Sequence, residues 1–361
     1  MPTPQDTALF IGDSRIAQNA PSMPQHGYGS AVTYEWFGLP TGWFDMQSPG
    51  DTNFSSDVGK QWNLRSSRTF GALVMGSGGT TLLDHWDPGA GSHTAYDTAI
   101  AAYTAASSPS LNFALCYLGP NSVQTTSSWT KADIVAAYGR LGDAIHALNG
   151  SPFLYLDIFS EKDAVGAGFS GGFANASYRT QMDNYRQAIL DAVGTHSLRM
   201  GPNLMGELYA DHTHPDTLAF ATYFGRAVDL VLQGGRTPRL VSATINSAKR
   251  VIRLTVDQDL GNSIGSSFGG MRVLDDASVV DISGATFTVV SVRAMTITLV
   301  LAIVGVCKVS FASASDAVNA TIPFSANYTA PDGATFTTPL EPFFDVVAPI
   351  SADFAVKFQH A

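Results

Sequence analysis

The sequence is poor in charged residues and has no cluster of basic ones. Asp, Glu, Lys and Arg together make up 14% of the 361 residues, and the net charge at pH 7 is −10. A nucleic-acid-binding protein needs Lys or Arg gathered on one face, so binding to nucleic acid is not expected. Hydrophobic residues reach 45%, which excludes a disordered chain and allows sizeable cores.

Long apolar runs, cysteine motifs and a leader sequence are also missing. A membrane span needs about 18 apolar residues, and the longest run, around 297–306, is shorter and β-branched, so we expect a buried strand there. No Cys/His spacing is typical of zinc, and we expect Cys116 and Cys307 to be buried free thiols. The first residues lack the basic and apolar regions of a signal peptide. We therefore expect no cofactor, no metal and no membrane span. The compartment stays unassigned, although a virion-associated or cell-surface setting would suit such a chain.

Over the first two-thirds, short apolar runs alternate with helical patterns. Strands are expected at 8–11, 70–75, 112–118, 152–159 and, from a weaker pattern, 198–200, and helices at 130–148, 175–193 and 215–232. Strands that alternate with helices predict a parallel sheet covered on both faces. Ligands of such sheets bind beyond the carboxyl ends of the strands.

The pattern changes near residues 234–235. From Leu240 onward, β-branched runs follow one another between Gly, Asp and Asn turns, which is typical of an all-β sandwich. We therefore expect two domains, residues 1–236 and 237–361, with a long loop insert at 18–69 in the first. The second domain is expected to serve carbohydrate recognition or assembly, and a homo-oligomer, if one forms, would be held through it.

Ser14 is the candidate nucleophile. It ends the motif Gly12-Asp13-Ser14 directly after an apolar strand, where its side chain would reach the carboxyl edge of the sheet. A serine hydroxyl needs a base within about 3 Å to take its proton. The tripeptide alone is also common in ordinary turns, so it does not decide the matter by itself.

The segment Asp211-His212-Thr213-His214-Pro215 supplies a candidate base. A spacing of three residues lets Asp211 hold one ring nitrogen of His214 while the other faces the serine. Two other interpretations stay open for this segment. It could simply cap the helix that follows, or His212 and His214 could bind a metal together with Asp84 and His85.

Two further motifs offer donors for an oxyanion. The motif Gly119-Pro120-Asn121 follows one predicted strand, and the Gly-rich turn at 76–81 follows another. Acyl transfer requires donors at the position where the carbonyl oxygen becomes negative. Asn121 and the backbone N–H groups of Ser14 and Gly78 are the candidates. The turn has no Lys of a phosphate-binding loop.

The four motifs, in this order, resemble those of the SGNH (GDSL-like) hydrolase family over roughly residues 7–233. The block of the serine matches at 12–14, the SGxTT form of the glycine block at 77–81, the block of the asparagine at 119–121, and the DxxH block, followed by proline, at 211–215. Ser122 stands where the family usually has Asp, and the insert between the first two blocks is atypical. The resemblance implies a flavodoxin-like three-layer α/β/α fold and ester hydrolysis through an acyl-serine intermediate. It also implies a Ser14–His214–Asp211 triad and an oxyanion hole made by Ser14, Gly78 and Asn121.

All five tryptophans lie in the first domain, between residues 36 and 129. Trp stacks well on sugar faces, so their position near the motifs favours an acylated carbohydrate as substrate, although each could also pack in a core. The candidate substrate-binding residues are Trp36, Trp43, His85 and Trp86. We therefore expect a carbohydrate O-acetylesterase. The alternatives are a lipid or thioester acyl hydrolase, and a structural or glycan-binding protein with a vestigial site.

Overall fold

The computed structural model describes two compact parts of the chain. The described residues are 4–13, 33–37, 44–45, 55–118, 129–157, 181, 184–185, 187–189, 191–192, 198–203, 218–236, 238–259, 271–311, 327–337, 340 and 343–351. By their contacts, Met1–Gly171, Asn175–Arg236 and Tyr328–Phe336 form one unit, and Gly172–Ala174, Thr237–Asn327 and Thr337–Ala361 form the other. Residues 328–336 therefore group with the first unit, whereas the sequence analysis assigned them to the second domain.

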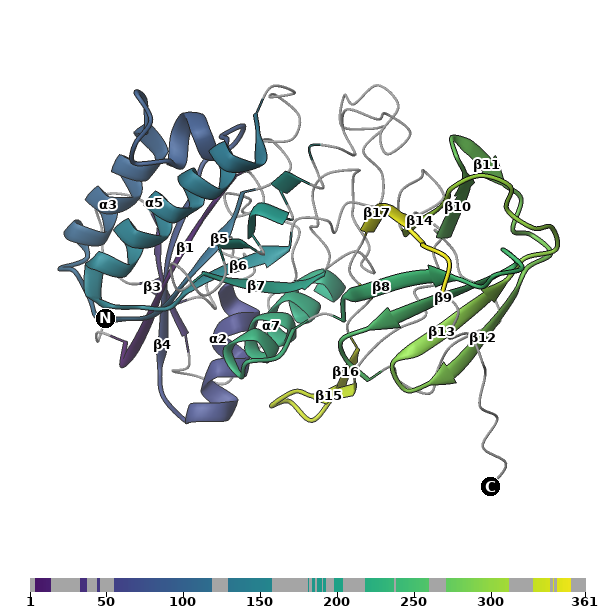
Figure 1. The fold of residues 1–361 in the computed structure, drawn as a ribbon. Coiled ribbons are helices and arrows are strands. Elements are labelled where there is room, and N and C mark those ends of the chain that lie inside the picture. Colours follow the sequence, from purple (N-terminus) through teal and green to yellow (C-terminus); the bar gives the residue numbers. More distant parts are fainter. Residues whose placement is uncertain are drawn as a thin grey trace. The chain divides into compact units, whose positions relative to one another are not determined.

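The first unit contains a mixed seven-stranded sheet (Figure 1). Its strands are β1 (Asp6–Gly12), β2 (Thr33–Phe37), β3 (Phe44–Asp45), β4 (Phe70–Gly76), β5 (Leu111–Tyr117), β6 (Phe153–Asp157) and β7 (Leu198–Asn203). Their order is β3-β2-β4-β1-β5-β6-β7, and every neighbouring pair is parallel except β2 and β3. All of β1 is buried, as expected of a parallel strand with both faces covered.

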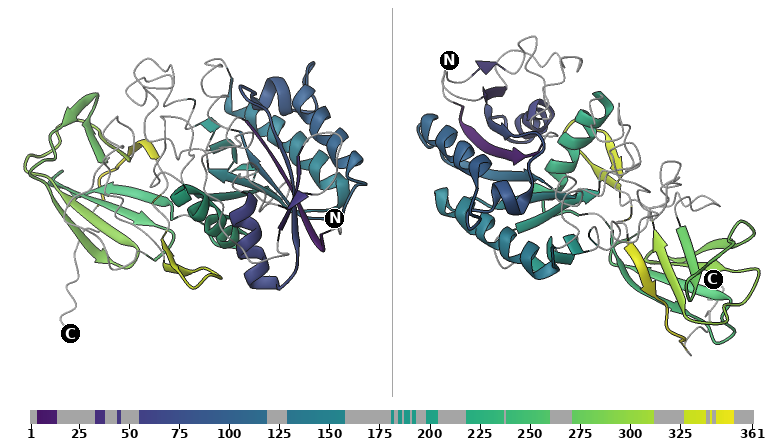
Figure 2. Two further views of the ribbon diagram at one scale, coloured as in Figure 1. Left: turned by 180° about the vertical axis from the view of Figure 1, so that it is seen from behind. Right: turned by 90° about the horizontal axis from the view of Figure 1, so that it is seen from above.

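Helices lie on both faces of this sheet. They are α2 (Ser55–Ser66), the π-helical turn η1 (Leu82–Trp86), α3 (Thr94–Ala105), α5 (Lys131–Asn149) and α7 (Leu218–Leu232). Figure 2 shows α3 and α5 on one face and α2 and α7 on the other, and α2 packs directly against α7. The predicted α/β class is therefore confirmed for this unit.

Helix α5 shows how local sequence sets an element's ends. Thr130 accepts a hydrogen bond from the backbone N–H of Asp133, whose carboxylate accepts one from the N–H of Thr130, so the two residues form a capping box. Gly150 ends the helix with φ +74°, a left-handed conformation that glycine adopts without steric cost. The predicted helix at 130–148 is confirmed.

The insert at 18–69 was expected to be a long loop, and this prediction is wrong for part of it. Helix α2 and strands β2 and β3 lie within this range. Helix α2 is rich in polar residues, so its periodicity is weak. Trp62 fixes the helix against the sheet. Its ring lies 5.7 Å from that of Phe70 and 5.6 Å from that of Phe113, and its Nε1 donates a hydrogen bond to Asp6 at 2.9 Å.

The second unit consists mainly of two four-stranded antiparallel sheets. One has the order β11-β10-β14-β17 and the other β12-β13-β9-β8. Their strands are β8 (Leu240–Ile245), β9 (Val251–Val256), β10 (Met271–Asp275), β11 (Ser278–Val280), β12 (Thr286–Ser291), β13 (Ala294–Thr298), β14 (Cys307–Phe311) and β17 (Phe343–Val347). Burial alternates along β9, where Ile252, Leu254 and Val256 are buried. Such alternation is typical of a sheet with one covered face.

The expected buried strand around 297–306 ends early. Strand β13 stops at Thr298, and the exposed fractions of Val300, Leu301 and Val304 are 55%, 75% and 84%. The chain leaves the sheet here because its amides bind elsewhere: the carboxylate of Asp275 accepts hydrogen bonds from the N–H groups of Val304 and Gly305. The prediction is therefore wrong for residues 299–306.

Candidate active site

Three strands end side by side at the centre of the parallel sheet. Gly12, the last residue of β1, pairs in register with Gly76 of β4 on one side and with Tyr117 of β5 on the other. Beyond the strands, Ser77 N–H donates to Gly12 O at 3.0 Å, and Asp13 N–H donates to Tyr117 O at 3.1 Å. The backbones that lead to Ser14, Gly78 and Asn121 are thus tied together at one edge.

Ser14, Asn121, Asp211 and His214, the residues expected to be catalytic, lie outside the described residues. Ser14 directly follows Asp13, and Asn121 is the fourth residue after Tyr117. Asp211 and His214 stand between β7 and α7. The triad of Ser14, His214 and Asp211 therefore stays a prediction.

Gly78 is the oxyanion candidate that the structure does describe. It is exposed in a turn that begins at Ser77, and Thr80 closes this turn by donating from Oγ1 to Ser77 O at 2.6 Å. Gly79, also exposed, has φ +72°, a backbone conformation that favours glycine. The turn therefore presents backbone rather than side chains two residues beyond the end of β4.

Trp86 is buried beneath this turn and supports it through a hydrogen bond to Thr80. Its exposed fraction is 1%, and its Nε1 donates to Thr80 Oγ1 at 2.9 Å. A buried indole offers no face to a sugar, so this position argues against the expected substrate-binding role of Trp86. Of the other expected substrate-binding tryptophans, Trp36 is described only as part of the backbone of β2, and Trp43 lies outside the described residues.

His85 lies half-buried in η1 with its ring held by the preceding turn. Thr81 N–H donates to His85 Nδ1 at 3.1 Å, so Nδ1 acts as an acceptor and the proton of the neutral ring is on Nε2. Short π-helical turns such as η1 are frequent at functional sites. This geometry makes His85 a hydrogen-bond donor through Nε2, which suits a sugar hydroxyl or a carbonyl oxygen.

An ion pair between exposed Arg140 and buried Asp87 fixes the end of η1. Arg140 of α5 donates from Nε and from Nη2 to the two carboxylate oxygens of Asp87, at 2.8 and 2.5 Å. Asp87 also accepts a hydrogen bond from Gly89 N–H at 2.8 Å. A Cβ at Gly89 would lie 2.5 Å from Arg140 Nε, so any larger residue there would require the Arg140 side chain to move. No local sequence signal predicts this pair, because its residues stand 53 positions apart.

Cys116 lies on β5 behind the edge and is not a second nucleophile. Burial raises the pKa of its thiol well above the ordinary value, and the charge of nearby Asp13 raises it further. A neutral, buried thiol reacts slowly. Cys116 and Cys307 are both free and buried, as predicted.

Metal binding finds little support around η1. Asp84 accepts a hydrogen bond from Thr81 Oγ1 at 2.9 Å, and Nδ1 of His85 is also engaged by Thr81. Within the described part of the chain, no group of three or more His, Cys, Asp or Glu could hold a metal ion. None of the helices described there is long and apolar enough to cross a membrane.

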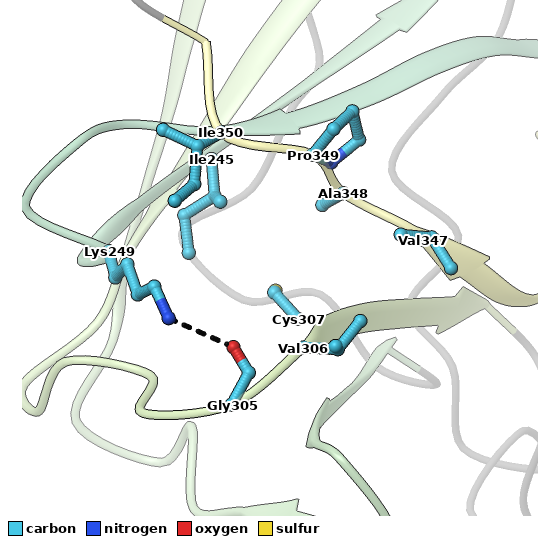
Figure 3. Close-up of a pocket in the computed structure, with 9 residues that line it drawn as sticks. All are labelled: Ile245, Lys249, Gly305, Val306, Cys307, Val347, Ala348, Pro349 and Ile350. Carbon is cyan, nitrogen blue, oxygen red and sulfur yellow. Dashed lines mark hydrogen bonds between the residues drawn. The ribbon is translucent and has the colours of Figure 1, made fainter.

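The second unit has a cavity of about 330 Å³ of its own (Figure 3). Apolar side chains line most of it, among them Ile245, Val306, Val347 and Ile350. Its cationic group, Lys249 Nζ, donates to the carbonyl oxygens of Val304 and Gly305 at 2.6 and 3.1 Å. The cavity therefore offers mainly apolar contact, and the carboxyl edge of the first unit remains the candidate active site.

Comparison with solved structures finds a similar overall fold in a carbohydrate acetylesterase. A carbohydrate acetylesterase from Xanthomonas citri superposes with a TM-score of 0.62 over 94% of this chain and 80% of its own, at 14% identity. Two other solved structures superpose less well. One is a protein from Arabidopsis thaliana, with a TM-score of 0.48 over 64% of this chain and 99% of its own, at 14% identity. The other is an acetyl xylan esterase from Geobacillus stearothermophilus, with a TM-score of 0.41 over 64% of this chain and 96% of its own, at 15% identity. No protein-family model matches the sequence, and no curated protein is similar to it. At this identity the first similarity establishes the fold alone.

Proposed function

We propose that this protein is a serine esterase of the SGNH type that removes acetyl groups from carbohydrates. The observation that supports the proposal most is the pairing of Gly12 with Gly76 and Tyr117, because the strands that precede the motifs of Ser14, Gly78 and Asn121 end side by side in the order β4-β1-β5. With β6 and β7, this order matches that of flavodoxin-like sheets, whose ligands bind where the strand order reverses. The three-layer α/β/α arrangement of the SGNH family and a β-sandwich for residues 237–361 belong to the same proposal.

The proposed roles of the catalytic groups follow the steps of the reaction. His214, oriented by Asp211, removes the proton from Ser14 Oγ as this oxygen attacks the acetyl carbonyl. The tetrahedral oxyanion accepts hydrogen bonds from the N–H groups of Ser14 and Gly78 and from the side-chain amide of Asn121. The intermediate collapses to acetyl-serine, and the sugar oxygen leaves with the proton from His214. Water, deprotonated by His214, then attacks the acetyl-serine and releases acetate.

The proposed substrate follows from the fold and from the donors near the edge. A solved structure of the same fold is a carbohydrate acetylesterase. The Nε2 donor of His85 and the exposed turn at Gly78 suit a polar substrate better than a long acyl chain. We propose that the second unit binds carbohydrate or a partner chain.

Labelling with a fluorophosphonate tests the nucleophile. The full chain should be labelled, and Ser14→Ala should not. Acetate release from an acetylated oligosaccharide and from 4-nitrophenyl acetate, compared with hydrolysis of 4-nitrophenyl octanoate, tests the substrate class. Faster hydrolysis of the octanoate would favour a lipid or thioester hydrolase. Absence of both labelling and hydrolysis would favour a glycan-binding protein with a vestigial site.

A further inference from the structure

A short hairpin from the C-terminal third of the chain belongs to the first unit. Its strands are β15 (Asn327–Thr329) and β16 (Thr335–Thr337). Ala330 N–H donates to Ala334 O at 3.0 Å, and Gly333, with φ +81°, makes the turn. Asp332 at the tip accepts a hydrogen bond from Ala334 N–H at 3.1 Å through Oδ1, which leaves Oδ2 for other partners. Figures 1 and 2 show the hairpin beside α7.

The tip of the hairpin binds both α2 and α7. Asp332 Oδ2 accepts hydrogen bonds from Gln61 Nε2 of α2 at 2.9 Å and from Arg226 Nε of α7 at 3.0 Å. The exposed fractions of the Asp332 and Arg226 side chains are 11% and 25%. Burial by itself would raise the pKa of Asp332, but the hydrogen bonds from Gln61 and Arg226 outweigh it, and the pKa is lowered. Asp332 is therefore a charged link between two helices.

A second contact joins the same three elements. Asp229 of α7 accepts hydrogen bonds from Arg65 of α2, at 2.7 Å to Nε and 2.5 Å to Nη2, and from the hydroxyl of Tyr328 on the hairpin. Arg65 Nη2 also donates to the Tyr328 hydroxyl oxygen at 2.7 Å. Burial and the bond to Asp229 raise the pKa of Tyr328, so its hydroxyl stays a donor.

Both sets of contacts involve one face of α7. Arg226 and Asp229 are three residues apart and so share a face of the helix. Between α2 and α7 there is no room for adjustment, because a Cβ at Gly225 would lie 2.7 Å from the backbone of Asp57. Two ion pairs and a close backbone approach therefore restrict both the translation of α7 along its axis and its rotation about this axis.

We infer that the hairpin 327–337 is a positioning element for the hydrolytic site, acting through α7. Helix α7 begins at Leu218, four residues after His214, so its position sets where the segment with the catalytic base ends. This inference rests on the proposed function. It assigns Tyr328 and Asp332 a role in the reaction of the first unit although both lie far beyond residue 236.

The test uses the full chain with Asp332→Ala and Tyr328→Phe. Arg68→Ala is the matched control, because Arg68 forms a similar pair with buried Asp6 at 2.8 Å, at the opposite, amino end of β1. We expect Asp332→Ala to lower kcat toward 4-nitrophenyl acetate about tenfold with KM changed less than about twofold, since a small misplacement of a catalytic group acts mainly on the chemical step. Tyr328→Phe should act in the same direction with a smaller effect. Arg68→Ala should leave kcat unchanged.

Hydrogen exchange provides a readout that does not depend on activity. Asp332→Ala should speed exchange of backbone amides in α7, at residues 218–232, and Arg68→Ala should not. Unchanged exchange in α7, or a melting temperature lowered as in Arg68→Ala with kcat intact, would overturn the inference. If Asp332→Ala does not fold, kcat and hydrogen exchange in α7 are measured for Tyr328→Phe and Asp332→Asn instead, and the same criteria apply. If the wild-type chain shows no esterase activity, the proposed function fails, whereas exchange in α7 still reports whether the hairpin holds the helix.

Discussion

The two units of this chain use their apolar residues in opposite ways. In the first, β1 is buried from end to end, and Leu64 is the one large hydrophobic side chain that is exposed among the described residues. In the second, burial alternates along β9, and Val241, Val279, Leu301, Val304 and Ile350 are all more than half exposed. In the first unit, apolar residues cover the sheet, and the candidate polar motifs follow the carboxyl ends of its strands. The second unit leaves several of its large apolar side chains on the surface.

The largest effect that this comparison predicts is the loss of activity when the edge of the first unit is changed. Ser14→Ala and His214→Ala should each lower kcat about 10⁴-fold or more, because nucleophile and base act as one unit. The measurement is acetate release at substrate saturation. Substitutions on the second unit, such as Leu301→Ser, should leave kcat unchanged. A Ser14→Ala variant with nearly full activity would refute the assignment.

Asn121→Ala should have the next largest effect. Removing one oxyanion donor lowers kcat by about 10²–10³ with a small change in KM, because the hydrogen bond is made mainly in the transition state. Steady-state kinetics with an acetate ester measure both constants. A large rise in KM alone would instead make Asn121 a substrate-binding residue.

A chain that ends at Arg236 should test how much the hairpin contributes to the stability of the first unit. It lacks Tyr328 and Asp332, so Asp229 and Arg226 of α7 would each lose a partner. We expect the first unit to be destabilised by about 3 kcal/mol, as when partly buried charges lose their partners. Urea denaturation of the truncated chain, compared with the first unit's transition in the full chain, measures this. Equal stability would show that the hairpin contributes nothing.

Trp86→Phe should have a smaller effect, on stability rather than on binding. The substitution keeps the aromatic packing and removes the donor to Thr80 Oγ1, a loss of about 1 kcal/mol. KM for an acetylated oligosaccharide should not change, because the indole is buried. If KM rises several-fold while the free energy of unfolding is unchanged, Trp86 binds sugar after all.

The smallest effect concerns the second unit at high pH. Burial raises the pKa of the Cys307 thiol from 9.0 to about 11, so the folded protein keeps the neutral thiol while the unfolded chain ionises. The contribution of Cys307 to stability is complete below pH 9 and is lost as the pH rises to about 11. The free energy of unfolding of Cys307→Ala should therefore fall less steeply over this range than that of the wild type. Parallel curves would contradict the shifted pKa.

The sequence predicted those elements that local signals define. Strands near β1, β4 and β5, and helix α5 with its Thr130 cap, follow from apolar runs and capping residues that lie close together in the chain. Helix α2 gave no such signal, because its few inward residues are held by distant ones such as Asp6 and Phe113. The strand expected around 297–306 ends at Thr298 for the opposite reason: its β-branched residues favour a strand, but the N–H groups of Val304 and Gly305 donate to Asp275 instead.

By itself, the sequence determined the α/β order of the first unit, the antiparallel strands of the second and the candidate motifs. Apolar period and turn residues act over a few positions, so they can be read without coordinates. Only the tertiary structure decided that Gly12 lies between Gly76 and Tyr117, that Trp86 is buried, and that Asp332 reaches back to Arg226. These contacts join residues that stand tens to hundreds of positions apart. Packing in three dimensions decides which residues meet, and the local sequence does not predict it.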